Sequence, residues 1–125
     1  MLESAIAHAT IAVSDLDRAK KFYEGTLGLK PVEERADGVR YQSGAGDWFL
    51  VYPSQFAGTA QSTYMSFEVD DVEVAVKELR DKGVVFEEYD FPGLKTVDGV
   101  ADFEGGKGSW FKDSEGNTLA LTQEG

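Results

Sequence analysis

The sequence predicts an α+β fold built from two copies of one strand–helix–strand–strand–strand module. The first observation is a strand–helix–glycine pattern over residues 5–30, and the second is a diverged copy of it 56 residues further along. A shift of 56 carries Ser14 onto Asp70 and Ala19 onto Ala75, so capping and apolar residues keep their order. Two sets of four strands, each with its helix outside, can pair into a curved sheet that encloses a cleft.

The first module is expected to span residues 5–53 and to open with a buried strand over residues 6–13, which are mostly apolar or small. Ser14 is suited to cap the following helix, because its hydroxyl can accept a hydrogen bond from an N–H group of the first turn. Gly28 and then Pro31 end that helix. Three further strands are predicted at residues 32–35, 39–43 and 48–52.

Residues 54–61 are small and polar and predict the linker to a second module, 62–123, within one domain of residues 1–125. A helix capped by Asp70 or Asp71 should follow the first strand of this module. Its strands are predicted at residues 62–69, 84–89, 109–112 and 118–122. The glycine-containing segment 91–108 shows no periodicity, which is typical of a functional loop or lid, or of a partly disordered segment.

Composition excludes several classes of function. A formal net charge of −11 disfavours nucleic acid and anionic membrane surfaces as partners. The absence of cysteine excludes disulfides, thiolate catalysis and zinc–thiolate sites. We expect a cytoplasmic protein, since no leader peptide opens the chain and no apolar run reaches membrane-spanning length.

Alternation along the strands predicts which side chains enter the cleft, because successive residues of a strand point to opposite faces. The cleft should contain one imidazole, several aromatic rings and small residues, which suits a small, partly apolar ligand. The aromatic rings can stack on such a ligand or can simply fill the interior. The expected ligand-binding residues are His8, Trp48, Leu50, Tyr52, Tyr64, Trp110 and Ala120.

His8, the single histidine of the chain, is the candidate catalytic residue. An unperturbed imidazole titrates near pH ~6.5 and can act as a general acid or base. The sequence offers no partner in register to orient the ring. A pocket histidine that hydrogen-bonds to backbone or ligand is therefore the competing interpretation.

These features resemble the vicinal oxygen chelate superfamily, which includes glyoxalase I, bleomycin-resistance proteins and extradiol dioxygenases. The resemblance extends from residue 5 to residue 123. It implies paired βαβββ modules in an eight-stranded incomplete barrel around a cavity, often in a homodimer. The segments that carry it are His8 and residues 13–19, 22–23, 27–29, 67–72 and 110–119.

Metal-dependent members of that superfamily place four ligands, usually His and Glu, on the cavity strands. The matching positions in this chain are His8, Leu50, Tyr64 and Ala120. A divalent ion needs at least three good nitrogen or oxygen donors, so the resemblance implies that the usual metal site is lost and no cofactor is expected. A divalent metal with non-standard ligands is the alternative, held by residues of a partner chain or by Asp98, Asp102 and Glu104.

The resemblance and the cleft together favour metal-independent binding or sequestration of a small, partly aromatic molecule, as bleomycin-resistance proteins do. A metal-dependent lyase, isomerase or dioxygenase of the same superfamily is the alternative. A third possibility is an interaction module whose cavity is filled by its own side chains. The expected partners are the small molecule and a second copy of the chain, and the modules can pair within one chain or between two.

Overall fold

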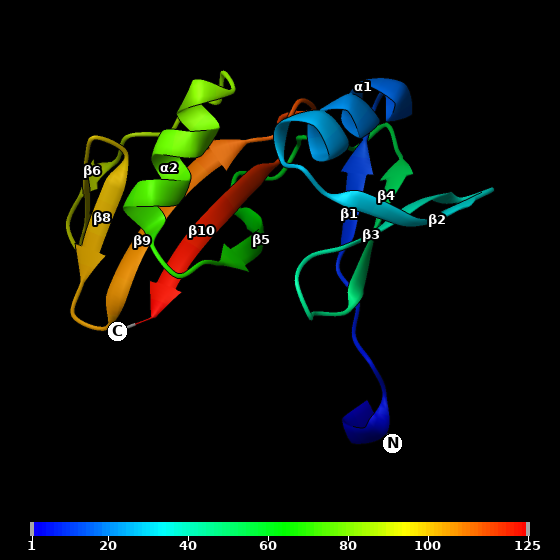
Figure 1. Cartoon of the computed structure of the whole chain (residues 1–125), viewed down its shortest axis with the longest axis horizontal. Coiled ribbons are helices and arrows are strands. Elements are labelled where there is room, and N and C mark those ends of the chain that lie inside the picture. The colour runs from blue at the N-terminus through cyan, green and yellow to red at the C-terminus, as the bar shows by residue number, and fades with distance from the viewer. Residues whose placement is uncertain (1, 125) are drawn as a thin grey trace.

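The structure, a computed structural model, describes residues 2–124 and contains a four-stranded and a six-stranded module, each with a helix after its first strand (Figure 1). The elements of the first module are η1 (Leu2–Ser4), β1 (Thr10–Val13), α1 (Leu16–Lys20), η2 (Lys21–Thr26), β2 (Lys30–Arg35), β3 (Gly38–Gln42) and β4 (Trp48–Pro53). The elements of the second module are β5 (Thr63–Glu68), α2 (Val72–Asp81), β6 (Asp90–Phe91), β7 (Leu94–Val97), β8 (Val100–Phe103), β9 (Gly106–Lys112) and β10 (Thr118–Glu124).

Each module forms its own open sheet. The strand orders are β1-β4-β3-β2 in the first sheet and β5-β10-β9-β8-β7-β6 in the second. In both sheets the first strand of the module pairs in parallel with its last strand, and the remaining pairs are antiparallel. The predicted α+β class and doubled module are confirmed, although the two sheets do not close into a barrel.

The helices begin at aspartates. Asp15 caps α1 by accepting a hydrogen bond from the Arg18 N–H at 3.0 Å, so the prediction that Ser14 is the cap was wrong. Ser14 is unavailable because its N–H and its hydroxyl both donate to Glu115. Asp71 caps α2, as one of the two predicted candidates. No helix within residues 2–124 is both long and apolar enough to span a membrane.

Two predictions for the second module were wrong. Residues 84–89 form no strand, and Phe86 makes only an isolated bridge to Phe111. Segment 91–108 is a run of hairpin strands, β6 to β8 and the start of β9, and not an irregular loop. Its glycines serve tight turns: Asp98 and Gly99 both adopt positive φ (53° and 80°), as a two-residue hairpin turn requires.

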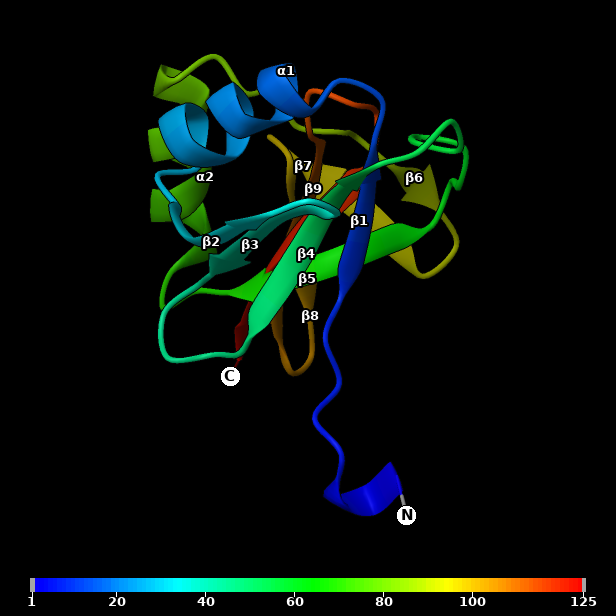
Figure 2. The ribbon, with the colours of Figure 1, turned by 90° about the vertical axis from the view of Figure 1, so that its right-hand side faces the viewer.

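One hydrophobic core spans both modules, and alternate residues of each sheet supply it. Ile11, Val13 and Val51 contribute from the first sheet, and Leu119 and Leu121 from the second. Because alternate strand residues point to opposite faces, most of the residues predicted to line the cleft lie on the sheet faces turned away from this shared core, whereas Tyr64 packs against it. Figure 2 shows the outer face of the first sheet in front of the second module.

The turn at residues 113–117 connects the two modules. The Tyr23 hydroxyl donates to Asp113 at 2.7 Å, and the Asn117 side-chain amide donates to the Ala12 carbonyl at 2.8 Å. Asn117 also accepts from the backbone N–H of Gly58, in the segment that joins β4 to β5, at 3.1 Å. This turn therefore fixes the position of the first module and of the connecting segment relative to the second sheet.

Candidate functional site

Trp48 lies between His8 and Arg40 on the outer face of the first sheet. Strand β4 carries Trp48 and runs between β1, which follows His8, and β3, which carries Arg40. The His8 ring stacks on the indole with centroids 3.5 Å apart and planes 11° apart. The Arg40 guanidinium carbon is 4.0 Å from the indole centroid. His8 precedes β1 and Arg40 lies on β3, so the two side chains reach the indole from opposite sides of β4.

The contacts with His8 and Arg40 reduce the indole surface of Trp48 that is available to a ligand. The sequence suggests that its indole is a free stacking face, but His8 and Arg40 fill that role within the protein. Its ring is only partly buried, so its edge remains open. The outer flat surface of the stack is the imidazole of His8, which has no further ring contact within residues 2–124.

The His8 ring has a defined orientation and tautomer. Its Nδ1 lies 2.7 Å from the backbone carbonyl oxygen of Trp48. A carbonyl oxygen can only accept, so Nδ1 carries the hydrogen and the lone pair of the neutral ring is on Nε2. The orienting partner that the sequence does not reveal is thus a backbone group. Nε2 is left to accept a hydrogen bond or a proton.

A charged row borders the stack on the same face. Leu50 is paired with Thr10 on one side and Arg40 on the other, and Arg40 is paired with Glu33. The Arg40 Nη1 atom lies 3.1 Å from the Glu33 carboxylate. The buried Nε of Arg40 has no hydrogen-bond partner within residues 2–124. A group able to accept a hydrogen bond would remove the cost of that unpaired donor.

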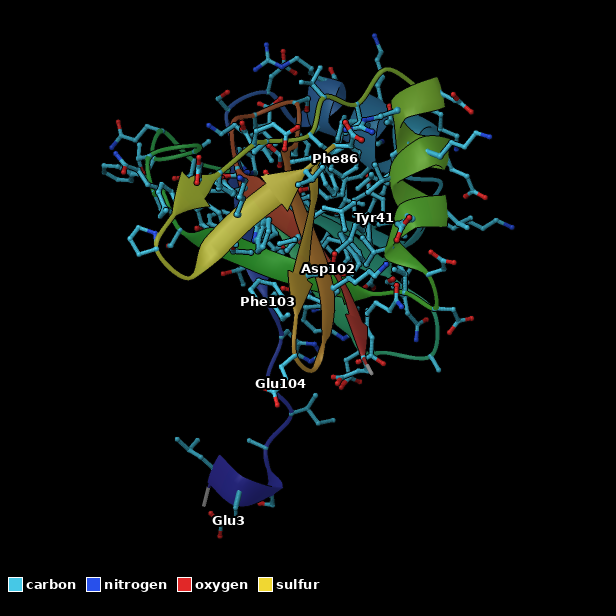
Figure 3. All side chains as sticks on the ribbon, turned by 90° about the vertical axis from the view of Figure 1, so that its left-hand side faces the viewer. Glu3, Tyr41, Phe86, Asp102, Phe103 and Glu104 are labelled. Atoms are coloured by element: carbon cyan, nitrogen blue, oxygen red, sulfur yellow. The ribbon has the colours of Figure 1, made fainter. Side chains whose placement is uncertain are left out.

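The second sheet carries an aromatic cluster on its own outer face, formed by Tyr89, Phe91, Phe103 and Trp110. Trp110 contacts Tyr89 and Phe103 at centroid distances of 5.5 and 6.4 Å, and Tyr89 contacts Phe91 at 5.5 Å. Phe91 and Phe103 are 55% and 46% exposed, and Figure 3 shows Phe103 on the hairpin formed by β8 and β9. A contiguous exposed apolar surface can mark a binding face, so this cluster is a candidate for one.

The remaining predicted residues are divided between the two faces. Leu50 and Tyr52 are half-buried on the first sheet, whereas Ala120 is buried opposite Trp110 on the second. A β-bulge interrupts the register at Tyr64, and its side chain packs against the shared core. Within residues 2–124, ring contacts join Trp48 to His8 and Trp110 to Tyr89 and Phe103. The predicted set is therefore divided into two groups of side chains on separate faces.

A family model decides where this chain belongs. The model of the Glyoxalase/Bleomycin resistance protein/Dioxygenase superfamily matches residues 5–121. The chain belongs to this superfamily. No curated protein matches the sequence.

Solved structures of similar fold are numerous, and three are representative. A glyoxalase family protein from Enterococcus faecalis shares 24% identity at a TM-score of 0.72, covering 98% of this chain and 99% of that chain. TnmS3, an antibiotic binding protein from Streptomyces sp. CB03234, shares 22% sequence identity at a TM-score of 0.69, and the match covers 97% of this chain and 98% of that chain. The fosfomycin resistance protein FosX from Listeria monocytogenes shares 15% sequence identity at a TM-score of 0.71, and the match covers 98% of this chain and 94% of that chain. At these identities the likeness establishes the fold alone.

The residues at the superfamily's metal positions do not fit a metal ion. Leu50 and Ala120 carry no donor atom, and Tyr64 packs against the core, so His8 is left alone. Asp98, Asp102 and Glu104 belong to β8 and its flanking turns, whereas His8 precedes β1 in the other sheet. Across residues 2–124, no three His, Asp or Glu side chains are grouped so that they could hold a metal.

The sequence prediction missed several residues of these two groups. Arg40 could have been found, because it alternates with the core residues Val39 and Tyr41 and so must point outward. Nothing in the sequence pointed to Tyr89 or Phe103, because the first lay in a strand that does not form and the second in an expected loop.

Proposed function

We propose that this superfamily member binds a small, partly aromatic molecule without a metal ion. The observation that carries the proposal is the oriented His8 ring, which presents one flat face and the Nε2 lone pair while the usual metal donors are missing. A conjugated ligand would stack on the imidazole and place a donor group against Nε2. Sequestration is supported by the kind of protein with this fold, since TnmS3 is described as an antibiotic binding protein.

A second copy of the chain would complete the pocket. The half-site around His8 and the aromatic cluster around Trp110 lie on faces turned away from the shared core, and each leaves apolar surface open. Opposing the His8 face of one copy with the aromatic cluster of another would bury both and enclose a ligand between them. A symmetric dimer would contain two such pockets.

Fluorescence titration with N-phenyl-1-naphthylamine tests the binding. This neutral, planar probe avoids repulsion by the net charge of −11 and brightens in apolar sites. We expect saturable binding that weakens in His8→Ala and in Phe103→Ala. Phe56→Ala is the matched control, because Phe56 is 64% exposed but lies in the segment between β4 and β5. Equal binding by all three variants would refute the proposal.

Mixing the two variants tests the composite pocket. In a dimer of one His8→Ala chain and one Phe103→Ala chain, one pocket carries both changes and the other carries neither. Mixing should therefore restore tight binding in half of the pockets of each mixed dimer. A pocket built within one chain predicts no restoration, and sedimentation of the protein should show a dimer if the composite pocket is correct.

A further inference from the structure

A hollow lies between the modules, on the core side of the sheets. This interdomain groove has a volume of about 200 Å³. Phe111 and Leu121 form its buried floor, at 0% and 4% exposure. Leu27 and Leu29, which follow η2, form one wall, and Ala75 and Leu79 of α2 help to form the other. His8, Trp48 and the aromatic cluster do not line it.

The rim of the groove is acidic. Among residues 2–124, Glu68 at the end of β5 and Glu78 on α2 are the only charged residues that line it, and no Lys or Arg of that range does so. Both side chains are exposed, and within residues 2–124 neither has a described ion pair or hydrogen bond. Two unpaired carboxylates beside an apolar hollow complement a cation attached to an apolar body.

We propose that this groove is a binding site for a small organic amine with a protonated head and an apolar ring or branched chain. The apolar part would contact Phe67, Leu29 and Leu79, which are half-buried, and would remove their remaining apolar surface from water, which supplies most of the affinity. The ammonium group would lie between Glu68 and Glu78. A hollow of about 200 Å³ is below the size of a drug-sized ligand pocket, so one ring with a short chain fits it.

The amine would also connect the two modules. Leu27 and Leu29 belong to the first module, whereas Ala75, Leu79 and Glu78 belong to the helix of the second. A molecule in contact with both walls binds only while the modules keep this relative position. Binding should therefore stabilise the folded chain by mass action, independently of any ligand on the His8 face.

Isothermal titration calorimetry with 4-phenylbutylamine tests the site, with 4-phenylbutyrate as the probe of opposite charge. The amine should bind and the carboxylate should bind at least about tenfold more weakly, because it would meet Glu68 and Glu78 as like charges. Glu68→Gln and Glu78→Gln should each weaken the amine about two- to fivefold, as expected for exposed ion pairs. Higher salt should weaken it further.

Ala75→Phe should abolish amine binding, because the phenyl ring would fill the groove. If Ala75→Phe does not fold, Glu68→Gln and Glu78→Gln still test the site. Glu73→Gln is the matched control, because Glu73 lies on the same helix outside the groove. His8→Ala should also leave amine binding unchanged, which separates this site from the proposed function. The inference is overturned by absent binding of the amine, by equal affinity for amine and carboxylate, or by full affinity in folded Ala75→Phe.

Discussion

The carboxylate of Glu115 in the second module meets the guanidinium of Arg18 in the first, with Oε2 2.7 Å from Nε. The other carboxylate oxygen accepts from the backbone N–H groups of Ser14 and Asp15 at 3.0 and 2.9 Å. The Glu115 side chain is fully buried, whereas that of Arg18 is 54% exposed. Glu115 therefore receives the orphan N–H groups at the start of α1 and holds that helix against the second sheet.

Replacing Glu115 with alanine should destabilise the protein by about 3 kcal/mol, because the N–H groups of Ser14 and Asp15 lose their acceptor inside the interface. Urea unfolding followed by circular dichroism measures this change. Glu73→Ala is the control, since its carboxylate is exposed and should matter by only about 0.5 kcal/mol. A loss below about 1 kcal/mol in Glu115→Ala would show that the contact between Glu115 and the start of α1 does not hold the two modules together.

Acid should weaken the same contact. The hydrogen bond from Arg18 is the main cause that lowers the pKa of Glu115 from 4.5 to about 2. A carboxyl whose pKa is lower in the folded than in the unfolded state stabilises the fold fully above pH 4.5, and this stabilisation is lost as the pH falls towards 2. Glu115→Gln should flatten the dependence of unfolding free energy on pH in that range.

Some slope should remain in Glu115→Gln, because Glu88 also has a lowered pKa. The Thr96 hydroxyl and the Gly99 N–H, which donate to its carboxylate, are the main causes. The double variant with Glu88→Gln should lose more of the slope than either single variant. An unchanged slope in Glu115→Gln would contradict the assigned role of Arg18.

Alkaline titration should distinguish buried from open tyrosines. Burial is the main cause that raises the pKa of Tyr23 and of Tyr41, and the hydrogen bonds to Asp113 and Glu24 add to it. A pKa raised above the unfolded value of 10 stabilises the fold fully below pH 10, and the stabilisation is lost as the pH rises above it. Ultraviolet absorbance should show these two phenols ionising only as the protein unfolds.

Protein unfolded in denaturant is the control, since all five of its tyrosines should titrate together near pH 10. Tyr23→Phe should remove one late-titrating group and cost about 1–2 kcal/mol of unfolding free energy, because Asp113 loses a buried donor. If all five tyrosines of the folded protein ionised near pH 10 while the fold stayed intact, the result would be inconsistent with the Tyr23–Asp113 contact.

The scaffold was predictable because its signals are local. Asp71 and Gly83 mark the two ends of α2, and the repeat at 56 residues gives the order of elements. Residues 84–89 were not predictable, because their apolar character suits a strand while their actual partners are set by tertiary pairing: the Glu87 N–H donates to Trp110 and the Tyr89 carbonyl accepts from Thr96. The glycines of residues 91–108 indicated turns, but nothing in the sequence indicated the strands between those turns.

For the candidate site, the sequence predicted only the face of the sheet on which each side chain lies. Alternation placed Trp48 and Leu50 on one face correctly with respect to the core, since Phe49 and Val51 are buried. It could not reveal that His8 and Arg40 would cover the indole, because strand order decides which residues lie next to Trp48. A bulge such as the one at Tyr64 also leaves no local signal, and it ends the alternation on which the expectation rested.

The proposed absence of a metal can be tested directly on His8. Leu50 and Ala120 supply no donor, so we expect purified protein to retain no stoichiometric divalent ion after gel filtration. Added Zn²⁺ or Mn²⁺ should not raise the melting temperature, although an ion at 100 times its dissociation constant would add about 2.7 kcal/mol of stability.

His8→Ala is the decisive comparison in the same experiment, because it removes the one usual ligand at these positions. The variant and the parent should show equal metal content by mass spectrometry and equal response to added Zn²⁺. A stoichiometric ion in the parent that disappears in His8→Ala would instead show that His8 binds metal, with further donors from a second copy. It would replace the binding-protein proposal with a metal-dependent lyase, isomerase or dioxygenase.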